Sequence, residues 1–347
     1  MKQDIVNEAL KERFLLQKEY LGDNKLVNQI NPLVSITVAT YQHVDYIKQC
    51  LDGILMQKTN FLYEVIIGED GSIDGTQEIC KEYARKYPDK IRLFIRDRKL
   101  SQFVTDNSEV IRFNGIWNRM SARGKYIAWC EGDDYWTDPY KLQKQVDFLE
   151  SHPDYVMCSH RFDKYWQESG VLEEDADKDF NGADYDLQNL IGGKWLTQTL
   201  TVMYRRSALD RERYERYGMS MDIILFYELL LHGKGYCFPE VMGVYRYHDG
   251  GVWSEVSQNR RRLIEFKARL AIYRVEQSDM AAQFLLYQFA KAMSRKWMLQ
   301  QWRIMIKVLC ILKKHYGSWF VAKLTFDKLV LNTNVEWKKI SEIRMIS

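Results

Sequence analysis

The sequence lacks a long apolar run, a cysteine framework and a secretory leader. In its C-terminal quarter the longest uncharged stretch is Met280 to Ala290, far shorter than the roughly 20 residues that a membrane-spanning helix needs. The first twenty residues carry charges throughout, which excludes the apolar core of a secretory signal. The six cysteines are scattered without a CxxC pair. This pattern indicates no zinc site or disulfide framework and predicts buried thiols in the cytoplasm.

Two common phosphate-binding motifs are also missing. The chain has neither a GxGxxG sequence nor a Walker lysine loop, which disfavours a dinucleotide site and a P-loop site. There is no internal repeat and no low-complexity tract. Of its 347 residues, 46% are hydrophobic and 28% are charged, as in ordinary globular proteins with one large domain or two smaller ones.

Charge is distributed unevenly along the chain. Residues 260–347 hold 18 Lys and Arg against six Asp and Glu, a net +12, whereas the whole chain carries only +3. A basic helical tail of this kind is typical of contact with anionic lipid or nucleic acid. Lysines there accompany tryptophans suited to a membrane interface, and these are Trp297, Trp302, Trp319 and Trp337. The alternative, which we favour, is a helical core that packs on the rest of the protein.

Hydrophobic periodicity predicts an α/β domain between two helical segments. Residues 1–30 have apolar positions near helical spacing and end before Asn31-Pro32. From Leu33 onward, short apolar strands alternate with amphipathic helices, which predicts a mostly parallel sheet with helices on both faces. The predicted elements are 34–40, 44–57, 64–70, 76–87, 91–97, 126–130, 140–150 and 155–160.

The second half is predicted to be less regular. Residues 165–190 are polar and acidic and are expected to form a mobile loop. A helix is predicted at 221–231, and from about Ser257 the chain is helical. The resulting domain boundaries are 1–30 for an N-terminal helical segment, 31–256 for the α/β domain and 257–347 for a basic helical region.

Carboxylates follow directly on one of the predicted strands. The strand from Tyr126 to Cys130 runs into Glu131, Asp133 and Asp134, and the carboxyl ends of strands are where open α/β sheets bind ligands. We expect Gly132 to allow a sharp turn there. Hard oxygen ligands of this kind suit Mg²⁺ or Mn²⁺. The alternative is a solvated acidic turn.

Polar residues also follow the first two strands. The first strand ends in Thr40-Tyr41, and Tyr41 can stack on a nucleotide base. The second ends in Asp70-Gly71, where the carboxylate can accept a hydrogen bond from the imide N–H of uracil and Gly71 leaves room for the ring. The alternative is a capped turn, a role that Asp74 and Thr76 also suit.

Three segments resemble family 2 glycosyltransferases of GT-A fold in their order and spacing. They are VSITVATYQHVDYIKQCLDGILMQ, EVIIGEDGSIDGT and GKYIAWCEGDDYWTDPYKLQKQVDFLE, and the resemblance covers about residues 33–255. It implies a Rossmann-like, mostly parallel sheet flanked by helices, the fold of nucleotide-diphospho-sugar transferases, with the basic helices as a C-terminal extension.

The resemblance also implies a nucleotide site. In this family the aspartate matching Asp70 binds the uracil of a UDP-sugar, and the residue matching Tyr41 packs on the base. Glu131-Gly132-Asp133 occupies the position of the DxD motif, which engages the ribose and the metal-bridged diphosphate. Glutamate at its first position departs from the commonest pattern and puts the ribose role in doubt. The implied nucleotide-binding residues are Thr40, Tyr41, Asp70, Gly71 and Glu131.

Metal ligands and a general base follow from the same resemblance. Asp133 and His248, the latter in YRYHDGG, are the implied ligands of Mn²⁺ or Mg²⁺. Asp222 matches the family's catalytic base before a helix, although an aspartate there is also typical of a helix N-cap. Secondary candidates for sugar or acceptor contacts are Asp134, Trp136 and Thr197, with a packing role as the alternative for the tryptophan.

The implied activity is an inverting glycosyl transfer from a nucleotide-sugar, expected to be UDP-linked, to a hydroxyl of a glycan or lipid-linked acceptor. Nucleic acid is not expected as a partner, and peripheral contact with anionic lipid would place the protein on the inner face of the membrane. One alternative is a metal-dependent nucleotidyltransferase. It would need a basic, glycine-rich loop after the first strand, and the sequence VATYQH is neither basic nor glycine-rich. The other is a non-enzymatic membrane-surface or nucleic-acid-binding module built on the basic tail.

Overall fold

The computed structural model describes residues 2–104, 110–175, 177–218, 221–251, 256–292 and 302–318. The chain divides into two compact units. The first comprises Met1–Asp186 and Leu196–Gly251, and the second comprises Leu187–Trp195 and Val252–Ser347.

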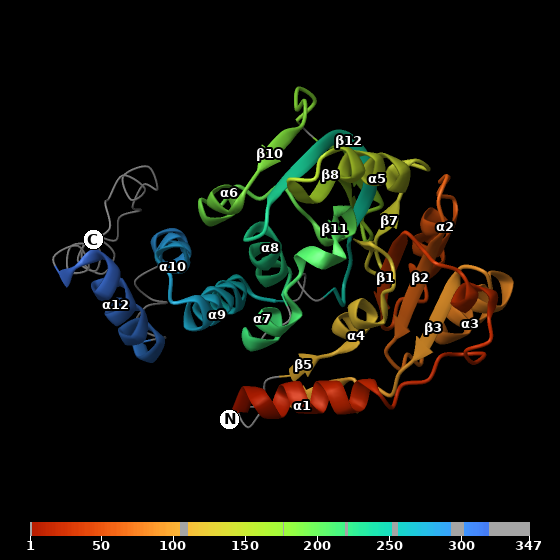
Figure 1. Ribbon diagram of the computed structural model, residues 1–347, viewed down its shortest axis with the longest axis horizontal. Coiled ribbons are helices and arrows are strands. Elements are labelled where there is room, and N and C mark those ends of the chain that lie inside the picture. The colour runs from red at the N-terminus through yellow and green to blue at the C-terminus, as the bar shows by residue number, and fades with distance from the viewer. Residues whose placement is uncertain are drawn as a thin grey trace. The chain divides into compact units, whose positions relative to one another are not determined.

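The first unit is built on one large sheet. In the described residues ten strands belong to it, and its main path runs β10-β12-β8-β11-β6-β1-β2-β3 (Figure 1). The neighbours β6, β1, β2 and β3 are parallel, β11 is antiparallel to both β6 and β8, and β8 is again parallel to β12. The predicted α/β fold with a mostly parallel sheet is therefore confirmed. The strands of this path are β1 (Val34–Thr40), β2 (Tyr63–Glu69), β3 (Ile91–Ile95), β6 (Tyr126–Trp129), β8 (Tyr155–Trp166), β10 (Ala183–Tyr185), β11 (Met203–Arg205) and β12 (Lys234–Tyr247).

Helices cover the parallel half of the sheet. The helix α2 (Ile47–Leu55) buries Ile47, Cys50, Leu51 and Ile54 at helical spacing, in one core with Val65 and Ile67 of β2. Burial on both faces explains why β1 and β2 are almost continuously apolar in sequence. Three further helices contact the sheet, namely α3 (Thr76–Lys86), α4 (Asn114–Ser121) and α5 (Lys141–Ser151).

The N-terminal helix is shorter than its sequence pattern predicts. Helix α1 spans only Lys2–Phe14, and the prediction of a helix over residues 1–30 is wrong beyond that point. The chain pairs with the free edge of β3 instead, because Glu19 forms a bridge with Phe94 and the Tyr20 N–H donates to the Leu93 carbonyl at 2.7 Å. Hydrogen bonding to an open strand edge thus outweighs a weak helical periodicity.

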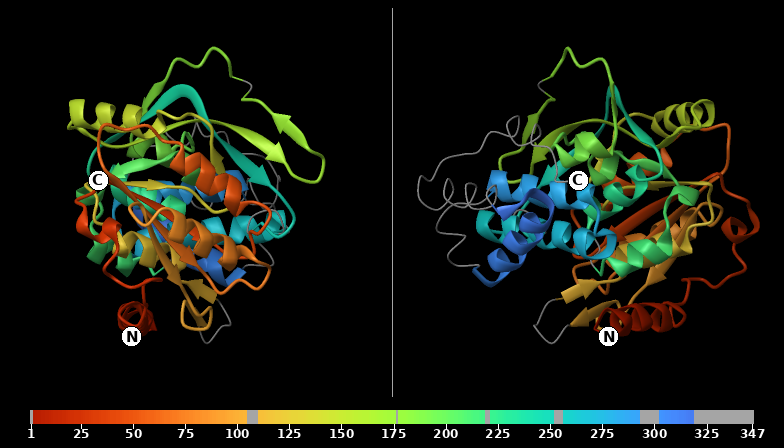
Figure 2. Two further views of the ribbon diagram at one scale, coloured as in Figure 1. Left: turned by 90° about the vertical axis from the view of Figure 1, so that its right-hand side faces the viewer. Right: turned by 60° about the vertical axis from the view of Figure 1, so that its left-hand side comes forward.

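The segment predicted to be a loop contains two strands. Strand β8 continues to Trp166, and β9 (Val171–Glu173) pairs with it before β10 pairs with β12. The acidic residues that suggested exposure are partly neutralised, since Arg161 pairs with Asp175 and Lys164 Nζ lies 2.8 Å from Glu173 Oε1. Figure 2 shows β12, in teal, bending along its length, and its register against β8 shifts at three places.

The described part of the second unit is helical. Helix α10 (Asp279–Ala292) contacts α6 (Leu187–Ile191), α9 (Gln258–Glu276) and α12 (Trp302–Tyr316). His315 joins these helices, with Nδ1 2.7 Å from Asp279 Oδ1 and Nε2 2.8 Å from Tyr273 Oη. Within the described helices, none combines the length and the apolar character needed to cross a bilayer. The predicted interface residues Trp297, Trp319 and Trp337 lie outside the described residues.

Candidate active site

Four chain segments with polar side chains meet at the carboxyl edge of the parallel strands. They follow β1, β2, β6 and β12. Thr40 of β1 is in register with Glu69 of β2, and Thr37 of β1 is in register with Trp129 of β6. Because parallel neighbours end at the same edge, the loops after these strands converge there.

The acidic turn after β6 is packed closely against β1. The Cys130 N–H donates to the Thr37 carbonyl at 3.1 Å, and the Gly132 N–H donates to the Ala39 carbonyl at 3.0 Å. A Cβ on Gly132 would lie 2.7 Å from Thr40 Oγ1 and 2.9 Å from His43 Nδ1. Gly132 lies in a turn that is closed by the Asp134 N–H donating to the Glu131 carbonyl at 3.1 Å, so the predicted turn is confirmed. Its φ is not positive, and the close approach to Thr40 and His43 is a further reason for a glycine at this position.

A cluster of polar and aromatic side chains surrounds Asp70, which is 3% exposed. Its Oδ2 lies 2.7 Å from Arg98 Nη1, and its Oδ1 accepts a hydrogen bond from the Ser101 hydroxyl. The Arg98 guanidinium carbon is 3.3 Å from the centroid of the Tyr41 ring, a cation–π contact. Burial raises the pKa of Asp70, although Ser101 and Arg98 oppose that shift. We call Tyr41, Asp70, Arg98 and Ser101 the base pocket.

Arg98 links two predicted nucleotide-binding residues, Asp70 and Tyr41, and sequence reasoning missed it. Its signal was the polar sequence RDRK directly after the third strand, the same place in the βα pattern as Tyr41 and Asp70. The predicted Gly71 follows Asp70 with φ +75°, and a Cβ there would lie 3.2 Å from the Arg96 carbonyl oxygen. Its backbone therefore passes close to the loop that carries Arg98.

The turn-forming role belongs to other residues of the same segment. Asp74 Oδ1 accepts hydrogen bonds from both the N–H and the hydroxyl of Thr76, while Oδ2 accepts one from the Val44 N–H. Thr76 Oγ1 accepts in turn from the His43 N–H at 2.8 Å. Asp74 and Thr76 thus fix the two loops to each other, and the carboxylate of Asp70 takes no part in this.

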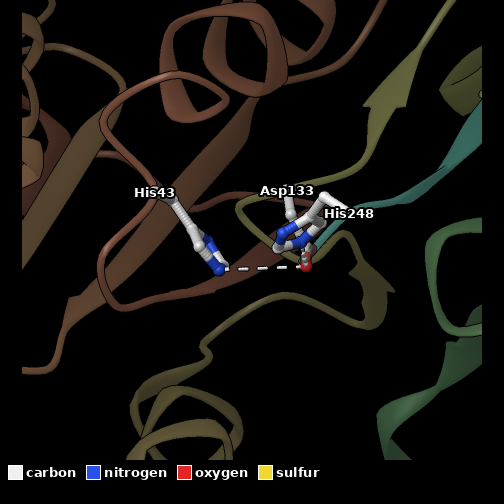
Figure 3. A group of neighbouring side chains, drawn as sticks. All are labelled: His43, Asp133 and His248. Carbon is white, nitrogen blue, oxygen red and sulfur yellow. Dashed lines mark hydrogen bonds and ion pairs between the residues drawn. The ribbon is translucent and has the colours of Figure 1, made fainter. Parts of the chain in front are cut away.

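A second cluster contains His43, Asp133 and His248 (Figure 3). Asp133 Oδ2 lies 3.1 Å from His248 Nε2 and 3.8 Å from His43 Nε2. One ligand atom from each residue lies within 4.8 Å of the other two. Two imidazoles and a carboxylate are a donor set that divalent cations accept, so the residues present fit the metal that the resemblance implies. We call these three residues the metal cluster.

Electrostatics keep Asp133 available as an anionic ligand. Burial acts to raise the pKa of Asp133, but the hydrogen bond with His248 and the charges of His43 and His248 lower it below its usual value. The same hydrogen bond raises the pKa of His248, whereas burial lowers that of His43. Asp133 and His248 were predicted from the sequence, whereas His43 was not. Its position three residues after β1, at the binding edge, was the available signal.

Glu131 is the first of the three carboxylates that follow β6. Glu131 Oε1 accepts a hydrogen bond from Trp129 Nε1 at 2.7 Å. Burial and the charge of Asp133 raise the pKa of Glu131 to about 8, and the charge of Asp222 acts in the same direction. Asp222 therefore lies within electrostatic reach of Glu131.

Asp222 also occupies the start of a helix. It is the first residue of α8 (Asp222–Leu230), after Met221 at the N-cap, and its Oδ1 accepts a hydrogen bond from the Ile223 N–H at 2.7 Å. Because the N-cap of α8 is Met221, the alternative role of Asp222 as a helix N-cap is wrong. A carboxylate fixed at a helix start is oriented by that hydrogen bond.

The predicted sugar or acceptor residues are enclosed by the chain itself. Asp134 Oδ1 accepts a hydrogen bond from the Arg246 N–H at 2.9 Å, and the aspartate is 2% exposed. Trp136 is equally buried and donates from Nε1 to the Leu200 carbonyl at 2.8 Å, as its packing alternative predicts. Thr197 is buried beside Leu196. None of the three is brought into the base pocket or the metal cluster.

Arg246, which was not predicted from the sequence, supports the backbone of the metal cluster. Its Nε donates to the Asp133 carbonyl at 2.8 Å, so it holds the backbone of a predicted metal ligand. The other guanidinium nitrogens donate to Gln49 and Gln167. Three tyrosine rings surround the guanidinium carbon at 5.0 to 5.3 Å, those of Tyr46, Tyr135 and Tyr165.

Two bacterial proteins are similar to this chain over most of its length. The uncharacterized protein Rv1520 of Mycobacterium tuberculosis is 34% identical over 238 residues, which cover 67% of this chain and 64% of that protein. The putative teichuronic acid biosynthesis glycosyltransferase TuaG of Bacillus subtilis is 28% identical over 62% of this chain and 79% of its own length.

A solved structure supports the fold assignment. The S. aureus protein TarS 1-349, in complex with UDP-GlcNAc, superposes with a TM-score of 0.55 and 17% identity, covering 81% of this chain and 80% of that one. At this identity the likeness concerns the fold alone. The family model for glycosyltransferase like family 2 matches residues 31–264. Since that range is most of the chain and contains both the base pocket and the metal cluster, the protein belongs to glycosyltransferase-like family 2.

Proposed function

We propose that this protein transfers a sugar from a UDP-sugar to an acceptor hydroxyl, with inversion at the anomeric carbon, in the biosynthesis of a glycan. One observation carries the proposal. A pocket that offers a buried carboxylate and an aromatic ring lies at the same sheet edge as a cluster that can hold a divalent cation. A base and a diphosphate need those two features side by side.

Uridine is the nucleoside that the base pocket suits. Asp70 can accept from the imide N–H of uracil, and Arg98 can donate to a neighbouring carbonyl oxygen, a pairing that cytosine cannot satisfy at its N3 position. Tyr41 offers a ring face for stacking, with Thr40 and Gly71 beside it. Glu131 is the proposed ribose contact. TarS, which shares the fold, was solved with UDP-GlcNAc, and this supports the choice of donor.

Asp133 and His248 would hold the metal ion, either Mn²⁺ or Mg²⁺. When bound, such a cation neutralises charge on the diphosphate leaving group. Arg246 fixes the Asp133 backbone, and Asp133 stays ionised because two histidines face it. Asp134 contributes by anchoring the turn to β12 through Arg246. Contact with sugar hydroxyls is the role we propose for its Oδ2, which has no hydrogen-bond partner within the described part of the chain.

Asp222 is the proposed general base. Its carboxylate would take the proton of the acceptor hydroxyl as that oxygen attacks the anomeric carbon. Attack from the face opposite the diphosphate inverts the configuration. The effect of the Asp222 charge on the pKa of Glu131 supports this role. Trp136 and Thr197 remain candidates for acceptor contact only if the loops around them open.

The acceptor is proposed to be a glycan or a lipid-linked intermediate. The name of TuaG, a relative in teichuronic acid biosynthesis, supports a glycan. Peripheral contact of the basic region 257–347 with anionic lipid would bring the protein to the inner face of the membrane, where such intermediates are elongated. Salt should weaken that contact, because each Lys or Arg near an anionic surface contributes about 1 kcal/mol.

A screen of nucleoside diphosphates tests the donor site directly. Thermal unfolding is followed with UDP, GDP, CDP and ADP, each with and without Mn²⁺, since a ligand that binds only the folded state raises the midpoint. UDP with Mn²⁺ is expected to give the largest rise in the unfolding midpoint. We then expect the protein to turn over a UDP-sugar. A nucleotidyltransferase would instead respond to nucleoside triphosphates, and equal responses to all four diphosphates would contradict the assignment of uridine.

A further inference from the structure

We propose that His43 completes the metal cluster as a third ligand, and that the resulting two-imidazole, one-carboxylate site selects transition-metal cations over Mg²⁺. The inference rests on the proposed metal at Asp133 and His248. It adds a ligand from the loop after β1 and restricts the class of cation. Mn²⁺, Co²⁺ and Zn²⁺ are the expected occupants.

One separation between donor atoms already fits a shared ion, and all three donor atoms lie within 4.8 Å of one another. Ligands about 2.1 Å from a cation, and roughly 90 to 110° apart around it, lie about 3.0 to 3.4 Å from each other. His248 Nε2 is 3.1 Å from Asp133 Oδ2, within that range, and His43 Nε2 is 3.8 Å from the same oxygen. A small rotation of the His43 side chain would bring it to the same separation.

The orientation of each ring also favours ligation through Nε2. His248 Nδ1 lies 2.8 Å from the Asp249 carbonyl oxygen, which leaves Nε2 directed at Asp133. His43 Nδ1 is buried near Gly132 and, among the described residues, has no hydrogen-bond partner. Its Nε2 is therefore the ring nitrogen that can meet a ligand. The converging nitrogens are visible in Figure 3.

The backbone holds His43 in this place. Its N–H donates to Thr76 Oγ1 at 2.8 Å, and Thr76 is itself fixed by Asp74. The imidazole is 17% exposed and that of His248 is 4% exposed. Both rings are therefore largely desolvated but reachable from the binding edge. An imidazole that served only to pack would not need a nitrogen directed at the carboxylate.

The composition of the donor set determines metal preference. Carboxylate and water oxygens suit Mg²⁺, whereas imidazole nitrogens suit the later divalent metals, whose affinities rise from Mn²⁺ to Cu²⁺ and remain above that of Mn²⁺ for Zn²⁺. Mg²⁺ also requires near-ideal octahedral geometry and keeps most of its water. Two nitrogens among three protein ligands should therefore penalise Mg²⁺ far more than Mn²⁺.

Electron spin echo spectroscopy on bound Mn²⁺ counts the imidazoles. The full chain is loaded with Mn²⁺, with and without UDP, and prepared with natural or ¹⁵N-labelled histidine. Nitrogen couplings from two imidazoles are expected in the wild type, and from one in His43→Gln and in His248→Gln. His152→Gln, at an exposed site, is the matched control and should retain both.

Metal affinity measured by calorimetry gives the second readout. Removal of a ligand should lower Mn²⁺ affinity by roughly tenfold or more, as changes around metal sites commonly do. Mg²⁺ affinity should change little in His43→Gln, so selectivity for Mn²⁺ falls. Circular dichroism and thermal unfolding check that each variant is folded.

Coupling from a single imidazole in the wild type, with unchanged Mn²⁺ affinity in His43→Gln, would overturn the inference and leave the proposed function intact. Two-imidazole binding without any turnover of nucleotide-sugars would support the ligand assignment and refute the function instead. Absence of bound Mn²⁺ under both conditions would overturn the inference as well.

Discussion

The base pocket and the metal cluster lie at one edge of the sheet but compensate negative charge in different ways. Asp70 has a permanent cation in the chain, because Arg98 Nη1 lies 2.7 Å from its Oδ2 and Ser101 satisfies the other oxygen. Asp133 faces two histidines, which are cations only when protonated. The base pocket is electrostatically complete, whereas the metal cluster can exchange protons for an external cation.

This difference indicates how the two regions divide the work. A completed ion pair keeps its geometry without ligand and is suited to recognising a neutral base by shape and hydrogen bonds. A carboxylate between imidazoles is suited to a charged ligand that comes and goes. Changes in the metal cluster should therefore affect turnover most, and changes in the base pocket should affect nucleotide affinity.

The largest effect is expected for Asp133→Asn. Loss of the anionic ligand should lower turnover by roughly 10²- to 10³-fold, the scale of losing one electrostatic contact to a developing charge. Steady-state kinetics with Mn²⁺ measure this effect, and Asp89→Asn, on an exposed loop, is the control. Full activity of Asp133→Asn, or of the wild type in excess chelator, would show that the cluster is not a metal site. The contrast between the base pocket and the metal cluster would then be wrong.

A somewhat smaller loss is expected for Asp222→Asn, which lies outside both regions. Turnover should fall by roughly 10²-fold, as for removal of a general base, while UDP affinity stays close to that of the wild type. Kinetics and calorimetry on the same preparation separate the two quantities. If turnover is preserved, the base is elsewhere, and Glu131 would be the next residue to change.

Asp70→Ala should affect binding rather than chemistry. We expect UDP affinity to fall by about 1 to 3 kcal/mol, the usual penalty for leaving a hydrogen-bonding group unpaired, with a much smaller change in turnover at saturating donor. Calorimetry with UDP measures it. Ser101→Ala keeps the Asp70–Arg98 pair and is the control, with a loss of less than half that size. Unchanged UDP affinity in Asp70→Ala would place Asp70 in the turn-forming role instead.

The smallest effect on turnover is expected for a substitution of Lys141, the first residue of α5. Its ammonium nitrogen lies 3.9 Å from the centroid of the Trp136 ring, and burial lowers its pKa to about 7. Between that pH and the ordinary lysine pKa near 10.5, the unfolded chain binds more protons than the folded one. The free energy of unfolding should therefore rise with pH by about 1.4 kcal/mol per unit across this window.

Lys141→Met should flatten that pH dependence. Urea unfolding at several pH values from 7 to 10, in the wild type, Lys141→Met and the exposed control Lys58→Met, measures the slopes. An equal slope in wild type and Lys141→Met would show that Lys141 titrates normally. A large fall in Mn²⁺ affinity would show instead that Lys141 supports the metal cluster.

The elements of the parallel half were predictable because their signals are local. The predicted strand 34–40 coincides with β1, and the helix predicted at 140–150 is within one residue of α5. Errors arose where distant pairing decided the structure. The edge of β3 ends the helical segment early, and Arg161 stabilises the acidic segment that was predicted to be a loop.

The sequence by itself determined which strands end in polar residues, and so it indicated Tyr41, Asp70, Asp133 and the edge where they lie. Apolar runs and their borders depend on neighbouring residues along the chain, which makes them visible in the sequence. Only the tertiary structure decided that Arg98 joins Asp70 to Tyr41 and that His43 faces Asp133. These contacts join loops that are far apart in sequence, and their distances depend on strand register and loop packing rather than on any local pattern.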